Sequence, residues 1–403
     1  MSLGFPLCAD AGHGERIRAA LDECVEFVTA RLPLVAVVLT GSFARGEGTV
    51  LRLADGTLKV LGDAEFFVVV PRLADAWRRR RDLAAWGREM SGRLGARGIR
   101  LDVEFGPVDV GFFRRRARPS IFVHDLRAHG KVLSGPRDLL DAIPPFEPPA
   151  IPREDALRLL LNRIVEQLET WDRLPALDAD GILDAAYQRL KLTLDLAGAA
   201  LAFAGTHTAL YRRRPAALAR LAAETPSLAA RLPAGFADEL ARAARAKLDP
   251  AGHFPAPPPR ASLAEQRAWL RARMQAAAPA ALGILRWQLG QLQGRDAPLE
   301  ALLDGFLRSA PFVERARAWV KLALNPLPPP RPVSHARAAR LFWTSTPRAL
   351  IHAAAAHAYA ALGAATPPDV ARFLPLARRA RPVDAAEQRR AVVALWRWCV
   401  RNH

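Results

Sequence analysis

Two pairs of carboxylates in the first 105 residues have the spacing of a divalent-cation site. Asp63 and Glu65 lie two residues apart at the start of one apolar run, and Asp102 and Glu104 lie two residues apart within another. Because successive side chains of a strand point to opposite faces, each pair shares one face if these runs are strands. Clustered carboxylates repel one another, and hard cations such as Mg²⁺ or Mn²⁺ neutralise them. Two such ions, about 3.5–4 Å apart, serve phosphoryl and nucleotidyl transfer.

A Gly-Ser turn precedes these carboxylates and suits the binding of a triphosphate. Gly41 and Ser42 directly follow the β-branched apolar run Leu34–Thr40, which is typical of a buried strand. Backbone N–H groups and a hydroxyl at a turn between strand and helix bind phosphate oxygens. Arg45 adds a positive charge for the leaving group. Glu47 is as compatible with an ion pair to a nearby arginine as with a catalytic role.

Both carboxylate pairs also have structural interpretations. An exposed edge strand would accommodate Asp63 and Glu65, but the segment Phe66–Val70 that follows is too apolar for an edge. A half-solvated strand with polar residues on its wet face would accommodate Asp102 and Glu104, and this alternative stays open.

Apolar periodicity predicts the elements that position these residues. In chain order they are a helix over 14–31, a strand over 34–40, a hairpin within 49–60, a strand over 64–71, a basic helix over 72–97, a strand over 99–105, and a helix and short edge strand within 123–133. The hairpin prediction depends on Ala-Asp-Gly-Thr between alternating apolar residues. Strands and helices therefore alternate through the part of the chain that carries the carboxylates.

A proline-rich segment, Ile143–Pro152, predicts a domain boundary. Beyond it nearly all periodicity is helical, over 153–173, 181–204, 215–247, 262–293, 310–325, 334–364 and 383–401. Proline-rich interruptions at 254–259 and 325–332 divide this region. We therefore predict a first domain over 1–145, a helical domain over 151–250, and, over 260–403, a second helical domain or a continuation of the first.

The motifs around the carboxylates resemble a known superfamily. GSFARGEG (41–48), GDAEFFVVV (62–70) and LDVEF (101–105) resemble the nucleotidyltransferase superfamily of DNA polymerase beta, above all a bacterial branch with a Gly-Ser-x-Ala-Arg-Gly-Glu signature. HDLRAHGKVLSGP (124–136) resembles the helix and edge strand that close many of these domains. The resemblance covers about residues 30–140. It implies an α+β fold: a mixed β-sheet flanked by helices, followed here by a large all-helical region.

The resemblance also implies roles for individual residues. It places the triphosphate at Gly41 and Ser42, with Arg45 beside it. The catalytic carboxylates that would hold the metal ions are Asp63, Glu65 and Asp102, with Glu104 as the fallback for the third. The sequence departs from the family pattern in two ways. The spacing from Ser42 to Asp63 is long enough for an inserted hairpin, and the second carboxylate is Glu where Asp is commoner.

Further candidates lie outside the carboxylate motifs. In related enzymes a Lys or Tyr of the following helical domain reaches the triphosphate, which points to Lys191, with Tyr187 one turn earlier. The alternative for Lys191 is a side chain that extends to water from an amphipathic helix. The cluster Tyr211–Arg214 fits a phosphate or nucleic acid, and equally a solvated helix start. We expect His124 and His129 to be structural.

The implied function is transfer of a nucleoside monophosphate, AMP from ATP, to a hydroxyl of a protein or small molecule, with Mg²⁺ or Mn²⁺ as cofactor. An RNA 3′ end is an alternative acceptor, although no recognised RNA-binding motif is present. A different class of protein, a non-catalytic one that retains the fold to bind a nucleotide or a partner, is the other alternative. The clustered carboxylates argue against it.

Composition limits the class of protein further. The cysteines Cys8, Cys24 and Cys399 fit neither a metal nor a disulfide spacing, which suits a reducing, cytoplasmic setting. We find neither a signal-peptide pattern nor a run of about 18 uncharged apolar residues, so no membrane partner is expected. Residues 1–150 contribute +3 to the net charge of +18, so the basic excess lies in the helical part. This excess fits a nucleic-acid or polyphosphate partner, or simply solvated Arg-rich helices.

Overall fold

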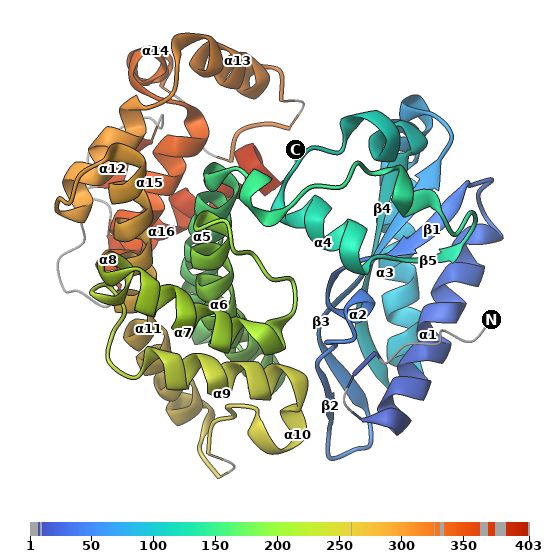
Figure 1. Ribbon diagram of the computed structural model, residues 1–403. Coiled ribbons are helices and arrows are strands. Elements are labelled where there is room, and N and C mark those ends of the chain that lie inside the picture. Colours follow the sequence, from blue (N-terminus) through green and yellow to red (C-terminus); the bar gives the residue numbers. More distant parts are fainter. Residues whose placement is uncertain are drawn as a thin grey trace. The chain divides into compact units, whose positions relative to one another are not determined.

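The computed structural model describes residues 7–8, 10–258, 260–325, 327–330, 334–362, 370–374 and 384–401 (Figure 1). The chain forms two compact units, each built from separate segments. The sheet unit comprises Met1–Asp155, Leu201–Leu218 and Ala237–Pro255, and the helical unit comprises Ala156–Ala200, Ala219–Phe236 and Ala256–His403. The predicted domains 1–145, 151–250 and 260–403 follow one another along the chain, whereas these units interleave. Three stretches of the predicted helical domain, 151–155, 201–218 and 237–250, thus belong to the sheet unit.

The sheet unit contains a five-stranded mixed sheet. Its strands are β1 (Ala36–Leu39), β2 (Val50–Arg52), β3 (Leu58–Val70), β4 (Ile99–Asp109) and β5 (Lys131–Ser134). The long strand β3 pairs with β4 in parallel along one edge. Along its other edge β3 pairs antiparallel first with β2 and then with β1, and β5 closes the sheet beside β1. The predicted hairpin and edge strand are both confirmed.

Helices pack on both faces of this sheet. The helices of the N-terminal part are α1 (Ala11–Thr29), α2 (Gly41–Ala44), α3 (Leu73–Ala96) and α4 (Ile121–His129), with the short helices η1 (Phe112–Arg116), η2 (Leu139–Ala142) and η3 (Pro148–Ala150). Helix α3 makes the crossover that parallel pairing of β3 and β4 requires. A Cβ at Gly87 would lie 2.5 Å from the carbonyl oxygen of Val103, so the absence of a side chain lets α3 pack directly on β4.

Alternate residues of β3 and β4 build the main core of the sheet unit. Ala64, Phe66, Val103 and Phe105 are buried together with apolar residues of α1 and α3. A second, smaller core on the opposite face of the sheet includes Val69, Val123 and Leu126, so α4 packs on that face beyond Glu65. The residues between the buried ones of β3 and β4 therefore point to the face that α1 and α3 leave uncovered.

The rest of the described chain is helical. The helices are α5 (Arg153–Arg173), η4 (Leu174–Ala176), α6 (Ala179–Phe203), η5 (Tyr211–Arg213), α7 (Arg214–Glu224), α8 (Pro226–Ala229), α9 (Phe236–Leu248), α10 (Pro250–His253), α11 (Leu263–Gln293), α12 (Leu299–Arg308), α13 (Phe312–Ala323), α14 (His335–Thr344), α15 (Pro347–Ala360), η6 (Val370–Phe373), α16 (Ala385–Trp396) and η7 (Arg397–Arg401). An all-helical continuation is thus confirmed as secondary structure.

Two segments that were predicted as single long helices are each divided into shorter helices. The segment predicted as one helix over 215–247 is divided among α7, α8 and α9, and the segment over 334–364 is divided between α14 and α15. Pro226 and Pro347 occupy the first turns of α8 and α15, where a missing N–H is tolerated, and each ends the helix before it. Helix α12 was not predicted. The predicted helical residues 363, 364 and 383 lie outside the described residues.

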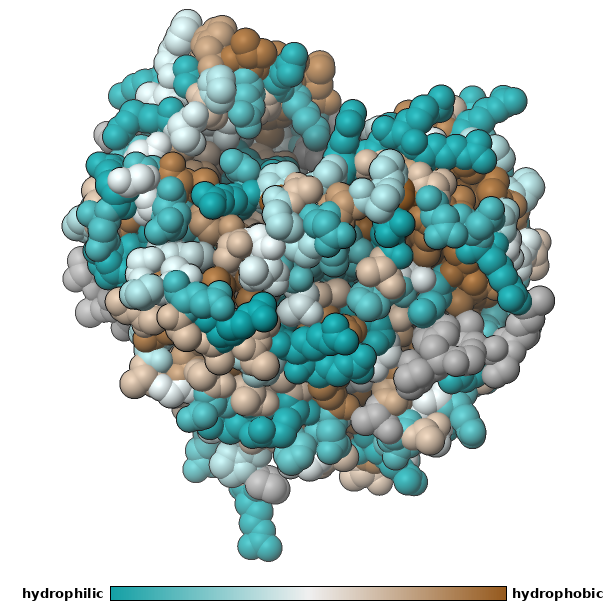
Figure 2. All heavy atoms as spheres, viewed as in Figure 1, coloured by the Kyte–Doolittle hydropathy of each residue, from teal (hydrophilic) through white to brown (hydrophobic). Residues whose placement is uncertain are grey.

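The surface of the helical unit carries exposed aromatic side chains. Phe312 of α13 stacks on Trp343 of α14 with ring centroids 5.7 Å apart, and 65% of Trp343 remains exposed. Figure 2 shows brown, hydrophobic residues at the top of the view, over α13. Within the described residues, no helix combines the length and the apolar composition that a membrane span requires.

A buried polar junction joins α5, α15 and α16 of the helical unit. The Oδ1 atom of Asn162 accepts hydrogen bonds from Nε2 of His352, at 3.2 Å, and from Nε1 of Trp396, at 3.0 Å. Burial, reinforced by the charges of Arg348 and Arg158, lowers the pKa of His352 to about 3. The imidazole is therefore neutral in the folded protein across the physiological range.

This junction predicts a pH dependence of stability. As the pH falls below about 6.5, His352 becomes protonated in the unfolded chain before it does in the folded chain. The contribution of the neutral imidazole to the free energy of unfolding is therefore full above pH 6.5 and is lost towards pH 3. In His352→Gln, which keeps an N–H donor for Asn162, the free energy of unfolding should fall between pH 7 and pH 5 by about 2 kcal/mol less than in the parent. Urea unfolding at both pH values measures this difference, and equal falls in the two proteins would contradict it.

Candidate functional site

The parallel register of β3 and β4 brings the two carboxylate pairs together. Asp63 lies opposite Asp102, and Glu65 lies opposite Glu104. All four side chains alternate with the core residues of their strands and therefore share the face that α1 and α3 do not cover. Asp63 and Glu65 are half-buried, whereas Asp102 and Glu104 are exposed. Asp63 and Glu65 do not lie on an exposed edge, because β4 pairs with them on one side and, between the ladders with β2 and β1 on the other side, Thr40 and Thr49 hydrogen-bond to the backbone of β3.

The Gly-Ser turn lies against the second of these carboxylates. At the end of β1 the Thr40 N–H donates to the carbonyl of Glu65, at 2.8 Å, and the Thr40 hydroxyl donates to its Oε2, at 3.1 Å. The chain then leaves the sheet through α2 and returns where the N–H of Leu61 donates to Thr49 O. The loop that contains Gly41 and Ser42 thus spans the edge of β3 at the level of Asp63.

Gly41 is tightly constrained by this contact. Its φ of +69° lies in the left-handed region, and a Cβ there would lie 2.9 Å from Oε2 of Glu65. Any side chain at this position would therefore strain the backbone and displace the carboxylate.

Gly41→Ala is expected to lower the free energy of unfolding by more than the about 1–2 kcal/mol of left-handed strain alone. Gly56→Ala is the matched control, because Gly56 has φ +82° and nothing within 4 Å of a Cβ. Urea unfolding of the two variants separates strain, common to both, from the contact with Glu65, which only Gly41 makes. Equal losses in the two variants would show that the contact with Glu65 adds nothing to stability.

Arg45 and Glu47 form a buried ion pair in this loop. Nε of Arg45 lies 3.6 Å from Oε2 of Glu47, and its Nη1 lies 3.6 Å from Oδ2 of Asp125. The side chain of Glu47 is fully buried and that of Arg45 is 10% exposed. The ion-pair interpretation of Glu47 is confirmed. For Arg45 the structure gives two carboxylate partners, and its role at a nucleotide stays a prediction.

Glu47 also holds the start of η5, far along the chain. Its carboxylate accepts hydrogen bonds from the N–H groups of Tyr211, at 3.1 Å, and Arg212, at 3.4 Å. The Tyr211 ring is buried, and the guanidinium carbons of Arg45 and Arg214 lie 5.3 and 4.3 Å from its centroid. The cluster predicted over Tyr211–Arg214 is therefore partly a buried packing unit, whereas its two middle arginines are exposed.

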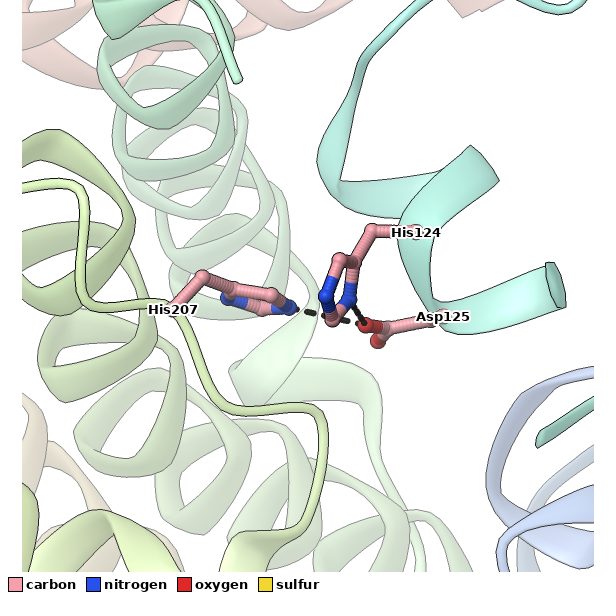
Figure 3. A group of neighbouring side chains, drawn as sticks. All are labelled: His124, Asp125 and His207. Atoms are coloured by element: carbon pink, nitrogen blue, oxygen red, sulfur yellow. Dashed lines mark hydrogen bonds and ion pairs between the residues drawn. The ribbon is translucent and has the colours of Figure 1, made fainter. Parts of the chain in front are cut away.

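A histidine and aspartate cluster lies beside this ion pair (Figure 3). Asp125 Oδ1 accepts a hydrogen bond from Nε2 of His207 at 2.8 Å and lies 3.4 Å from Nδ1 of His124. Burial alone would raise the pKa of Asp125, but the hydrogen bonds of the two histidines and the charge of Arg45 hold it well below its usual range. Asp125 therefore remains a carboxylate anion.

Sequence reasoning missed this cluster. It treated His124 and His129 as structural and considered neither Asp125 nor His207. His207 lies in the loop between α6 and η5, 82 residues from Asp125, and no local pattern connects them. Burial lowers the pKa of the neighbouring His129.

The remaining predicted residues fall elsewhere. Lys191, half-buried, and Tyr187, buried, lie on α6 in the helical unit, whereas the predicted carboxylates lie in the sheet unit. The role of Lys191 at a nucleotide stays a prediction.

One group of His, Cys, Asp or Glu side chains in the described part of the chain presents three ligand atoms within 4.8 Å of one another, and it is His124, Asp125 and His207. The carboxylates of β3 and β4 share a face without being gathered this tightly. Comparison of the chain with models of known protein families, with curated proteins and with solved structures found no match.

Proposed function

We propose that this chain is a metal-dependent nucleotidyltransferase that moves a nucleoside monophosphate, AMP from ATP in the first instance, to a hydroxyl of a protein or small molecule. The observation that carries the proposal is the register that sets Asp63 opposite Asp102 and Glu65 opposite Glu104 on one uncovered face. The Gly41-Ser42 turn beside Glu65 supports it.

Electrostatics favours a cation at this face. Like charges directly opposite each other on neighbouring strands destabilise a sheet. Neighbouring strands lie about 4.8 Å apart, which leaves the carboxylates of β3 within the reach of those of β4. Oxygen ligands of this kind suit Mg²⁺ or Mn²⁺, which would offset the repulsion.

The residues present fit the parts of such a reaction. Asp63, Glu65 and Asp102 would hold the divalent ions, which when bound stabilise the charge on the transferring phosphorus and its attacking and leaving oxygens. Backbone N–H groups of the Gly41-Ser42 turn and the Ser42 hydroxyl would bind the triphosphate. The Thr40 hydroxyl orients the carboxylate of Glu65 beside them.

The test is incubation of the purified protein with each α-³²P-labelled nucleoside triphosphate and Mg²⁺ or Mn²⁺, with host lysate and total RNA as acceptors. Label on a protein or a small molecule, with release of pyrophosphate, is the expected result and names the acceptor class. Label found on RNA alone would instead identify an RNA 3′ end as the acceptor. If neither label nor pyrophosphate appeared with either metal, we would conclude that the protein binds a nucleotide without transferring it. A rise in melting temperature on addition of a nucleotide would then detect the binding.

A further inference from the structure

The cluster of His124, Asp125 and His207 is a separate group from the four carboxylates of β3 and β4, and the proposed transfer does not use it. His124 and Asp125 project from α4, and His207 reaches them from the loop after α6 (Figure 3). The His207 side chain is 1% exposed, that of Asp125 14% and that of His124 20%. The group is thus embedded, with its more open side at His124.

The distances match those of a metal-ligand set. The ligand nitrogens lie 2.8 and 3.4 Å from Oδ1 of Asp125, and all three ligand atoms lie within 4.8 Å of one another. Ligands about 2.0–2.1 Å from a tetrahedral Zn²⁺ lie about 3.3–3.4 Å from one another. Small rotations of the side chains therefore suffice to place all three around one ion.

The donor types select the class of ion. Two imidazole nitrogens and one carboxylate oxygen suit Zn²⁺ and related d-block cations, whereas Mg²⁺ prefers oxygen ligands. An aspartate carboxylate is already ionised near neutral pH and needs no deprotonation before it binds an ion.

One arginine, Arg45, contacts two carboxylates beside the cluster. Arg45 faces Asp125 through Oδ2, at 3.6 Å, whereas both histidines face Oδ1. Glu47, in turn, pairs with Arg45 on its other side. The guanidinium of Arg45 therefore contacts Oδ2 of Asp125 and fixes the orientation of the carboxylate, so that Oδ1 faces the two histidines and can bind an ion.

We propose that His124, Asp125 and His207 bind one d-block divalent cation, with Zn²⁺ as the preferred ion, and that the ion fixes the loop after α6 to α4. The loop continues into η5, whose first N–H groups bind Glu47 in the Gly41–Thr49 segment. The ion would thus stabilise the arrangement beside the Gly-Ser turn. This inference stands independently of the proposed nucleotidyl transfer.

The second ring nitrogen of His207 determines how tightly we expect the ion to bind. Metal-binding histidines generally donate their other N–H to an acceptor, which raises the basicity of the ligand. Nδ1 of His207 is buried, and no hydrogen-bond partner for it lies in the described part of the chain. We therefore expect affinity for Zn²⁺ of about micromolar Kd, weaker than in closed structural zinc sites.

The test measures Zn²⁺ binding to chelator-treated full-length protein by isothermal titration calorimetry, and the visible absorption of Co²⁺ as a stand-in. We expect one Zn²⁺ per chain, and a Kd raised by more than about tenfold in His207→Ala and in Asp125→Asn. His253→Ala is the matched control, because His253 is an exposed histidine 3.7 Å from one aspartate, Asp249, without a second histidine. It should leave the Kd unchanged.

Two further variants keep the test decisive. His124→Ala alters the most open ligand and should also raise the Kd by more than about tenfold even if the His207 variant fails to fold. Asp63→Asn should bind Zn²⁺ like the parent, which separates this site from the carboxylates of β3 and β4. Absence of stoichiometric binding by the parent, or binding that survives in His124→Ala and His207→Ala alike, would overturn the proposal.

Discussion

Replacement of Asp63 by Asn is expected to lower nucleotidyl transfer by at least about 10²–10³-fold. The amide keeps the size of the side chain and removes its charge, so an ion at the uncovered face would lose a ligand. Because Asp63 is half-buried on a strand paired along both edges, the variant should fold like the parent. Release of pyrophosphate and transfer of α-³²P label measure the loss.

Asp82→Asn provides the matched control for this variant. Asp82 is about half exposed on α3, where it pairs with Arg79, and α3 covers the opposite face of the sheet. The same chemical change there should leave transfer unchanged. Full activity of Asp63→Asn, or an equal loss in Asp82→Asn, would contradict the assignment. In the same assay a deeper loss in Asp102→Asn than in Glu104→Gln would identify Asp102 as the third carboxylate.

That the two carboxylates of each pair share a face could be predicted from sequence, because it depends on a period of two within each strand. The predicted strand over 64–71 is only part of β3, which extends back to Leu58 through its pairing with β2. The register of β3 with β4 also shifts between Lys59 and Asp63. A shift of one residue turns side chains to the opposite face. No local pattern reports such a shift, so which carboxylates oppose each other had to come from the structure.

The cluster around His207 could not be predicted for a different reason. Helical periodicity shows which face of a helix is apolar but not which unit buries that face. Leu201–Leu218 and Ala237–Pro255 alternate along the chain with segments of the helical unit, yet they belong to the sheet unit. Hydrogen bonds from η5 to Glu47, and from Lys247 to Thr49, join residues more than 160 positions apart. Such pairings follow from tertiary packing alone.

Glu47→Ala is expected to lower the free energy of unfolding by about 3–5 kcal/mol, the largest stability effect that we predict. Glu47 is fully buried, and its removal leaves Arg45 with one carboxylate partner fewer in a poorly solvated position. It also leaves the N–H groups of Tyr211 and Arg212 without their acceptor. Urea unfolding followed by circular dichroism measures the loss.

Two companion variants separate the causes of this loss. Glu89→Ala removes the exposed partner of Arg93 on α3, where an ion pair one turn apart contributes only about 0.3–0.5 kcal/mol. Glu47→Gln keeps one oxygen acceptor, for one of the two N–H groups of η5 that the two carboxylate oxygens bind, and loses the charge that faces Arg45, so its stability should lie between those of the parent and Glu47→Ala. If Glu47→Ala lost no more stability than Glu89→Ala, the buried pair would not hold η5 in place. If Glu47→Gln were as unstable as Glu47→Ala, the charge opposite Arg45 would account for the effect, because Gln retains both an acceptor and most of the volume of the side chain.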